Sequence, residues 1–287
     1  MNLENITLIL QKQSNLFGSR IFFGGCPTLI YNVPRLCEGQ GLELQIFNKP
    51  QNMIRNTNVD FTTNALPFAK PMLADGTGNL VELFAGSRSV GNVAEAKGMN
   101  VFSIDWQKFD KIDLAIDIEE LQIKDVPFIP DVVWASPDCT TYTIAAISTH
   151  RNGTKPKSDY AKKCDAVNQH FISLIDKWLL LNPKMVFFIE NPRGMMRKMP
   201  FMQRFKRHTV WYCTYGDDRA KPTDIWTNSE VWQPRPMCHN GNKNCHHQPA
   251  PRGSKTGTQG KKGSFNRSKI PTELCQEIIE CSILAVV

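Results

Sequence analysis

Two side chains in this 287-residue chain stand where they could form or break bonds. Cys139 follows Ser-Pro-Asp and precedes Thr-Thr, and a thiol held in such a loop is a candidate nucleophile. Glu190 follows an apolar run and precedes Asn-Pro, where a carboxyl group is a candidate proton donor or acceptor. Each residue also has a plainer interpretation, because most cysteines are inert packing residues and Glu190 could cap a following helix.

A third group of residues has the pattern of a ligand-binding turn. The segment that starts at Glu82, Glu-Leu-Phe-Ala-Gly-Ser-Arg-Ser, passes from an apolar run into a glycine turn, where the backbone can approach a ligand closely. Asp105 ends the next apolar run, where a carboxylate commonly binds a pair of ribose hydroxyls. Trp106 beside it could stack on an adenine ring. In this order the residues favour a nucleoside ligand over a surface acid beside a core aromatic residue.

The elements that must position these residues are short apolar runs and helical repeats. We expect strands over residues 80–84, 101–104, 131–135, 185–189 and 209–213, and helices over residues 90–97, 160–181 and 271–284. Strands that alternate with helices predict parallel βαβ units and a doubly wound α/β sheet. Because ligands bind at the carboxyl ends of the strands in such a sheet, the candidate residues should gather along that one edge.

Composition and charge limit the class of protein. At 41% hydrophobic and 21% charged residues the chain is globular, and no apolar run reaches the roughly 18 residues of a membrane span. The N-terminus lacks the pattern of a signal peptide, so we expect nine reduced cysteines and a cytoplasmic location. We also expect a monomer. Residues 193–269 hold 16 Lys and Arg against 4 Asp and Glu. This basic segment suggests a polyanion partner, most commonly nucleic acid, and a solvated basic surface is the alternative.

The sequence divides into three parts. Residues 1–75 show no sustained period and form an N-terminal extension of unclear structure, and Met72 is an alternative start. Residues 76–222 and 269–287 form the α/β domain. Residues 223–268 are rich in Pro, Gly, Asn, His and Lys, and they are interpreted as a small basic irregular insert.

Taken together, these groups resemble the motifs of the DNA (cytosine-5)-methyltransferase family, in its compact phage and bacterial form. The motifs follow the family's order, with the cofactor turn at 82–86, the Pro-Cys loop at 137–139, the Glu-Asn strand end at 190–192 and the arginine block at 215–221. The Ser87-Arg88 region replaces the family's second glycine, and Lys221 replaces the second arginine. The resemblance covers roughly residues 79–226. It implies a class I S-adenosylmethionine-dependent methyltransferase fold, which is a Rossmann-like doubly wound sheet, with the insert as target-recognition region.

The resemblance also implies a reaction and the residues that perform it. A methyl group would pass from S-adenosylmethionine to C5 of a cytosine flipped out of double-stranded DNA, in a bacterial or phage-infected cell. Cys139 would add to C6 of the base, Glu190 would protonate N3, and Arg219 would polarise O2. Basic neighbours would lower the pKa of the thiol. The residues implied to hold the cofactor are Phe84, Ala85, Gly86, Ser87, Asp105, Trp106, Asp117 and Pro137.

Several polar residues outside these motifs are candidates for contacts with DNA or a metal. The candidates for phosphate contacts are Arg151 and Lys155 in a flap over residues 144–158, Lys221, and Arg252 and Lys255 in a Gly-rich cationic stretch. Solvated basic loops are the alternative. The candidates for a metal are Cys238, His239, Cys245 and His247. Their spacing is not that of a standard zinc finger, so we expect polar loop residues and no metal, with a zinc cluster as the alternative.

Three other functions remain open at the level of sequence. An amino-methyltransferase acting on cytosine N4 or adenine N6 uses a Ser/Asp/Asn-Pro-Pro-aromatic loop and no thiol, and Ser136-Pro137 is similar to its start. A non-catalytic module of the same fold would bind DNA or a protein partner. The basic insert is equally compatible with RNA as the substrate.

Overall fold

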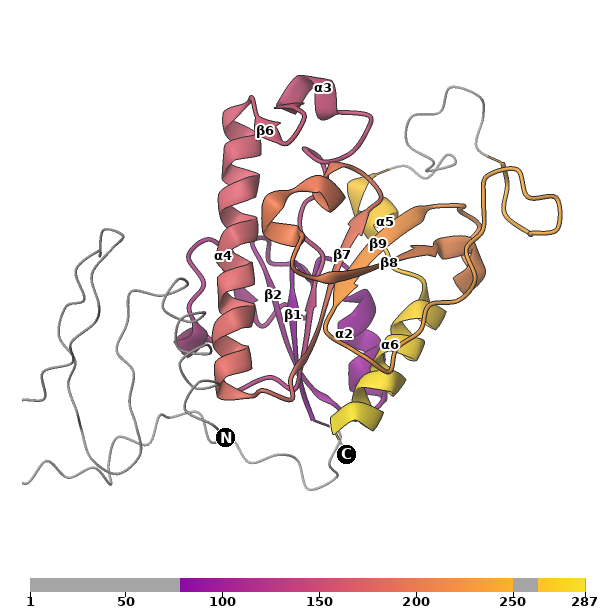
Figure 1. Cartoon of the computed structure of the whole chain (residues 1–287). Coiled ribbons are helices and arrows are strands. Elements are labelled where there is room, and N and C mark those ends of the chain that lie inside the picture. Colours follow the sequence, from indigo (N-terminus) through magenta and orange to yellow (C-terminus); the bar gives the residue numbers. More distant parts are fainter. Residues whose placement is uncertain (1–77, 250–262, 287) are drawn as a thin grey trace, which may run out of the picture. The chain divides into compact units, whose positions relative to one another are not determined.

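The computed structural model describes residues 78–249 and 263–286, and its centre is a seven-stranded sheet in the order β3-β2-β1-β4-β7-β9-β8 (Figure 1). The strands are β1 (Asn79–Leu83), β2 (Asn100–Asp105), β3 (Leu114–Ala115), β4 (Val132–Ala135), β7 (Val186–Pro192), β8 (Lys206–Trp211) and β9 (Pro222–Thr227). The strands from β3 to β7 pair in parallel, whereas β9 is antiparallel to both β7 and β8.

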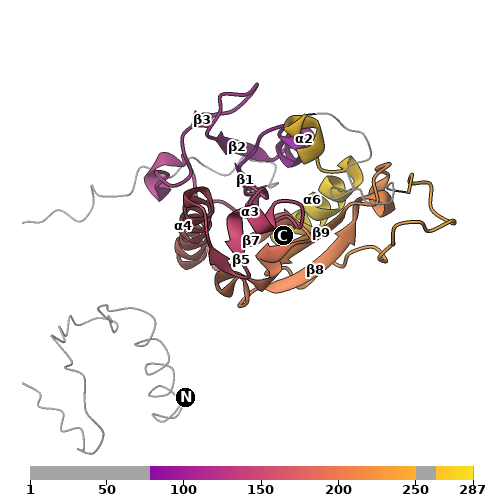
Figure 2. The same ribbon diagram turned by 90° about the horizontal axis from the view of Figure 1, so that it is seen from above.

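Helices cover both faces of this sheet. They are α4 (Asp159–Leu181) on one face, and α2 (Ser89–Ala96) and α6 (Thr272–Val286) on the other (Figure 2). Successive residues of a strand point to opposite faces, so in β4 Val133 packs in the cluster under α4 and Trp134 in the cluster under α2 and α6. Burial on both faces explains the uninterrupted apolar runs of the sequence. The prediction of an α/β sheet with mostly parallel strands is confirmed.

Local sequence signals set the bounds of the helices. α4 begins where Ser158 Oγ accepts a hydrogen bond from Ala161 N (3.1 Å). It ends before Asn182, because the proline that follows disfavours helical backbone at the preceding residue. The chain leaves α2 through Gly98, whose φ of 86° lies in the left-handed region. The shorter helices are α3 (Ile147–His150), α5 (Ser264–Ser268), η1 (Ile123–Asp125), η2 (Met195–Lys198), η3 (Pro200–Met202) and η4 (Tyr212–Tyr215).

β9 lies where the sequence suggested an irregular insert. Residues 223–227 are part of the large sheet, so the irregular stretch begins after Thr227 and not after residue 222. The composition was misleading because Asp224 is fully buried in β9, where it pairs with Arg197 (2.5 Å) and interrupts the apolar alternation of a strand. The strand expected over 209–213 ends at Trp211.

The predicted flap over residues 144–158 has its own small structure, which consists of α3 and a hairpin of β5 (Arg151–Asn152) and β6 (Lys155–Pro156). The extension over residues 1–75, together with Arg252 and Lys255, lies outside the described residues. Within the described part of the chain, none of the helices combines the length and the apolar character needed to cross a membrane.

Candidate active site

The candidate residues come from the carboxyl ends of β1, β2, β4 and β7, which lie along one edge because these four strands are parallel. The turn at 84–88 follows β1, Asp105 ends β2, and the loop at 136–139 follows β4. Glu190 lies in the last part of β7. The structure thus brings together the four groups that the alternation of strands and helices placed on one edge.

The turn after β1 has an unusual backbone conformation. Phe84, Gly86 and Arg88 have φ angles of 57°, 49° and 51°, in the left-handed region that favours glycine. Arg88 therefore adopts, at a cost of roughly 1 kcal/mol, a conformation that glycine adopts freely. Its buried guanidinium donates to Ser103 Oγ (2.8 Å) and pairs with Glu95 (2.6 Å), and these contacts hold the turn without a second glycine.

Glu82 lies beneath this turn and ties β1 to α2. Its buried carboxyl group accepts hydrogen bonds from Val90 N and Ser103 Oγ (both 3.2 Å), and burial raises its pKa to about 7. A Cβ atom on Gly91 would lie 2.4 Å from Glu82 Oε2, so a glycine is needed for this close approach. Sequence reasoning gave Gly91 no role of its own, although a glycine inside a helical pattern is a signal of such packing.

The residues expected to bind a nucleoside offer groups of the right kind. Asp105 is nearly buried, which raises its pKa, and its two oxygens accept hydrogen bonds from Gly86 N (3.0 Å) and Gln107 N (2.9 Å). The carboxylate keeps a lone pair that can accept from a ribose hydroxyl. The Trp106 side chain beside it is 68% exposed and available for stacking. The turn also lines an open pocket of about 390 Å³, together with Phe109.

The other residues expected to hold the cofactor have varied surroundings. Ala85 N donates to a carbonyl of β2 (3.0 Å), and Ser87 Oγ lies 2.9 Å from Ser89 Oγ, so both stabilise the turn. Asp117 is paired with Lys163 (2.8 Å), and this hydrogen bond lowers the pKa of Asp117. Asp117 is therefore already engaged by a lysine on α4.

The loop that carries Cys139 is fixed to β7. The buried Asn191 donates from Nδ2 to Pro137 O (3.0 Å), and Cys139 O accepts from two N–H groups of the following turn. The Cys139 side chain is half-buried. Burial raises the pKa of its thiol to about 11. The positive charge of Lys221 lowers this pKa, and the negative charge of Glu190 raises it, but both effects are smaller than that of burial. The thiol of the free protein is therefore protonated at neutral pH.

Glu190 lies between a phenol and an ammonium group. Tyr212 OH donates to Glu190 Oε1 (2.9 Å), and burial together with the charge of Glu190 raises the pKa of Tyr212 well above its usual value. Lys221 Nζ lies 3.9 Å from the same oxygen and above the Tyr212 ring. Sequence reasoning assigned Lys221 to DNA, quoted Asn191 in a motif without giving it a role, and missed Tyr212. Asn191 adjoins Glu190 in a known motif, whereas nothing in the sequence pointed to Tyr212.

Arg219, expected at the base, is occupied by other contacts. It is 1% exposed and donates to both Asp217 oxygens (2.8 and 2.5 Å) and to the carbonyls of Arg267 and Lys269 (both 3.0 Å). Four of its five N–H donors are used in this way. Arg219 therefore fastens the segment before β9 to α5, and the cation that faces Glu190 is Lys221.

The two flap residues expected at DNA differ in exposure. The buried Arg151 guanidinium pairs with Asp165 (2.6 Å) and donates to Thr141 O (2.9 Å). It ties β5 to α4 and to the loop of Cys139, so it is not offered to a phosphate in this structure. Lys155, on β6, is exposed.

Three of the four residues of the alternative zinc cluster lie close together in the structure. Cys238, Cys245 and His247 lie next to Cys213, and His239 is not in this group. Cys213 was missed because it belongs to η4, well before the insert in the chain and inside a stretch predicted as a strand.

Comparisons with known proteins give little similarity. No protein-family model matches the chain, and no curated protein matches it either. Among solved structures, the chain is similar to the crystal structure of the S. pombe Dnmt2 methyltransferase, with a TM-score of 0.36 and 13% identity. The match covers 55% of this chain and 52% of that one, so this chain spans about half the length of the solved structure.

Proposed function

We propose that this chain transfers the methyl group of S-adenosylmethionine to C5 of cytosine in double-stranded DNA. The observation that carries the proposal is the pairing of Glu190 with Lys221 (3.9 Å) at the carboxyl edge of the sheet, where the charges of both residues act on the thiol of Cys139. The turn at 84–88 and Asp105 lie along the same edge, where a base and a methyl donor can meet. The sheet order, with β9 antiparallel between β7 and β8, supports the class I methyltransferase fold.

The residues at the ends of β1 and β2 fit the cofactor. S-adenosylmethionine supplies an electrophilic methyl group on a sulfonium centre. Asp105 has a lone pair left for a ribose hydroxyl, and the exposed Trp106 ring can stack on the adenine. A Cβ atom added at Gly86 would meet only Phe84 O, at 3.9 Å, so the backbone of the turn is open to a ligand.

Methyl transfer to C5 of cytosine requires a nucleophile that adds to C6 and an acid that protonates N3. C5 of cytosine is a weak nucleophile until a group adds to C6. The Cys139 thiol gives its proton to the Glu190 carboxylate, and its sulfur forms a bond to C6. The electron pair of the C5–C6 double bond then moves toward C5 and the ring nitrogen N3, which takes that proton from Glu190. Lys221 favours the thiolate before this attack and stabilises the charge that develops on O2.

The reaction ends with the release of the enzyme thiolate. After C5 has taken the methyl group, its hydrogen leaves as a proton to water, and the electron pair re-forms the C5–C6 double bond. The bond between sulfur and C6 breaks at the same time, and Glu190 recovers the proton from N3. Because the base must reach Cys139 at the sheet edge, the target cytosine has to leave the duplex.

Duplex DNA containing 5-fluorocytosine tests this proposal. Fluorine at C5 cannot leave as a proton, so the bond between Cys139 and C6 should persist. We expect a denaturation-resistant protein–DNA complex with S-adenosylmethionine present. The complex should disappear in Cys139→Ala and persist in Cys281→Ala, which removes a partly exposed thiol on α6.

The same assay separates the other functions. Methyl transfer to DNA that survives in Cys139→Ala would contradict C5 chemistry and favour an amino-methyltransferase. An adduct formed only with 5-fluorocytosine in RNA would move the proposal to an RNA substrate. Absence of cofactor binding in calorimetry, together with DNA binding, would indicate a non-catalytic module.

A further inference from the structure

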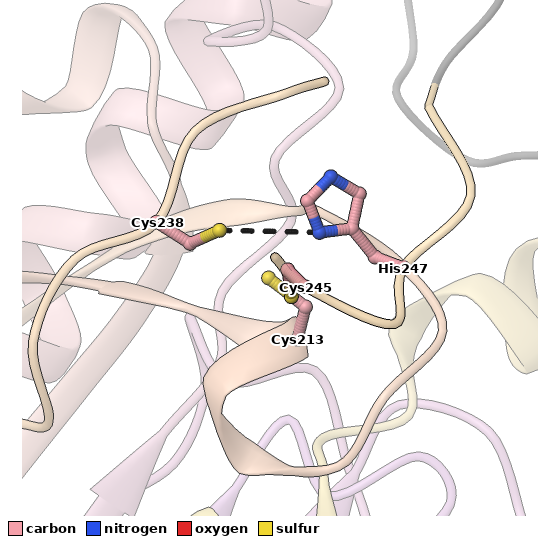
Figure 3. Close-up of side chains that lie close together, drawn as sticks. All are labelled: Cys213, Cys238, Cys245 and His247. Atoms are coloured by element: carbon pink, nitrogen blue, oxygen red, sulfur yellow. Dashed lines mark hydrogen bonds between the residues drawn. The ribbon is translucent and has the colours of Figure 1, made fainter. Parts of the chain in front are cut away.

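Four side chains with metal-binding atoms meet near the ends of β8 and β9 (Figure 3). Cys213 comes from η4, and Cys238, Cys245 and His247 come from the stretch that follows β9. The three Sγ atoms and a ring nitrogen of His247 all lie within 4.8 Å of one another. The three cysteines have free thiols.

The distances among these atoms are close to those of a tetrahedral zinc site. With Zn–S bonds of about 2.3 Å and a Zn–N bond of about 2.1 Å, neighbouring ligand atoms lie about 3.5–3.8 Å apart. Cys238 Sγ and His247 Nδ1 are 3.9 Å apart. Contraction of the widest separation by about 1 Å would place all four atoms around one ion.

The surroundings of these atoms also suit a bound ion. Asn242 Nδ2 donates to Cys238 Sγ (3.3 Å), a contact that stabilises a thiolate ligand. His247 is buried, Nδ1 faces the sulfur of Cys238, and Nε2 has no hydrogen-bond partner among the described residues. Coordination through Nδ1 would supply an interaction that offsets the desolvation of this ring.

The stretch over residues 233–249 buries very little apolar surface. All of these residues are described, and they form no helix and no strand. Cys238 is the one apolar residue among them that is buried, and Met237 next to it is 70% exposed. A segment with so small a core commonly depends on a metal or a disulfide for its structure.

We propose that Cys213, Cys238, Cys245 and His247 bind one Zn²⁺ ion. Three thiolates and an imidazole are ligands that select zinc over magnesium or calcium. Because four protein ligands leave no open coordination position, the ion is structural and takes no part in chemistry. The proposal stands independently of the reaction at Cys139.

The ion would fix the segment that carries Lys221. His246 Nε2 lies 3.1 Å from Asp217 O, and Gln248 forms a β-bridge with Arg219. Both chain neighbours of His247 therefore contact the segment that runs into β9. Zinc at His247 would hold this segment in place, and so position Lys221 indirectly.

Metal analysis of the full chain, purified under reducing conditions, tests the proposal. We expect one zinc ion per chain by mass spectrometry of the metal content. Replacement by Co²⁺ should give sulfur-to-cobalt charge-transfer absorption and the intense visible bands of a tetrahedral site. Cys213→Ser and His247→Gln should lose most of the zinc. Cys281→Ser and His239→Gln, which remove a thiol and an imidazole outside the cluster, should keep it.

Three results would overturn the zinc site. They are wild-type protein that binds neither zinc nor Co²⁺, equal loss of zinc in His239→Gln and His247→Gln, and a disulfide among the three cysteines in protein purified with reductant. A chelator titration of the wild type avoids variants that fail to fold. It should release one zinc ion in step with the exposure of three thiols to a thiol reagent, and release without new thiols would contradict the ligand set.

Discussion

Lys221 Nζ lies 3.9 Å from Glu190 Oε1, although Glu190 belongs to β7 and Lys221 immediately precedes β9. The side chains are only 12% and 7% exposed, so water screens their attraction less than at the surface. The charges of both residues also act on the thiol of Cys139, in opposite directions. Burial is the main reason that the pKa of the thiol is raised, and the balance between this cation and this anion then adjusts how readily the thiol ionises.

Lys221→Met should make Cys139 less reactive. Loss of the positive charge raises the pKa of the thiol further above about 11, because burial and Glu190 then act unopposed. Alkylation of Cys139 by iodoacetamide, followed by peptide mass spectrometry, should slow by about three- to tenfold at a fixed pH. Lys155→Met, which removes an exposed lysine on β6, should leave the rate unchanged. An equal or faster rate in Lys221→Met would contradict the electrostatic role.

Tyr212→Phe should lower the rate of methyl transfer with a limited loss of stability. The phenol donates to Glu190 Oε1 (2.9 Å), and a hydrogen bond to a charged group contributes about 1.5–3 kcal/mol, which is roughly a tenfold to hundredfold change in rate. Single-turnover kinetics on cytosine-containing DNA measures this effect. Tyr215→Phe is the matched control, because that buried phenol donates to Glu277 on α6. Equal losses of rate in both variants would point to a structural effect only.

Arg219→Met should lower stability. The buried guanidinium pairs with Asp217 (2.5 Å), and loss of one partner of a buried ion pair costs about 3–5 kcal/mol. Urea unfolding monitored by fluorescence gives the change in the free energy of unfolding. Lys155→Met, which removes an exposed lysine, should cost much less in the same experiment. A stable Arg219→Met variant that has lost methyl transfer would instead place Arg219 at the base.

The sequence predicts five of the seven strands of the sheet, and it misses β3 and β9. Strands buried on both faces are continuous apolar runs, and this is why the strands that carry the candidate residues could be placed. β9 could not, because its buried Asp224 depends on Arg197, a partner distant in the chain. The sequence places the turn after β1, but not the contacts by which Arg88 replaces a glycine.

The candidate site, like the sheet, was only partly predictable from the sequence. Cys139 and Glu190 stand in recognisable motifs at strand ends, so their residue types and order are enough to make them candidates. Arg219 and Lys221 are two residues apart, and only the fold separates a cation that pairs with Asp217 from one that faces Glu190. Neighbours that approach from other elements, such as Tyr212, leave no local pattern in a sequence.

Glu82 should make the stability of the protein depend on pH. Burial raises the pKa of its carboxyl group from 4.5 to about 7, so the folded state binds the proton more tightly than the unfolded state does. The contribution of Glu82 is therefore fully present below about pH 4.5 and is lost as the pH rises to about 7, by up to about 3 kcal/mol. Glu82→Gln should remove this slope in urea unfolding between about pH 5 and pH 8. Glu230→Gln, which changes an exposed carboxyl group, should retain the slope. If the wild type instead became more stable over this pH range while Glu82→Gln did not change, burial would not be keeping the Glu82 carboxyl group protonated.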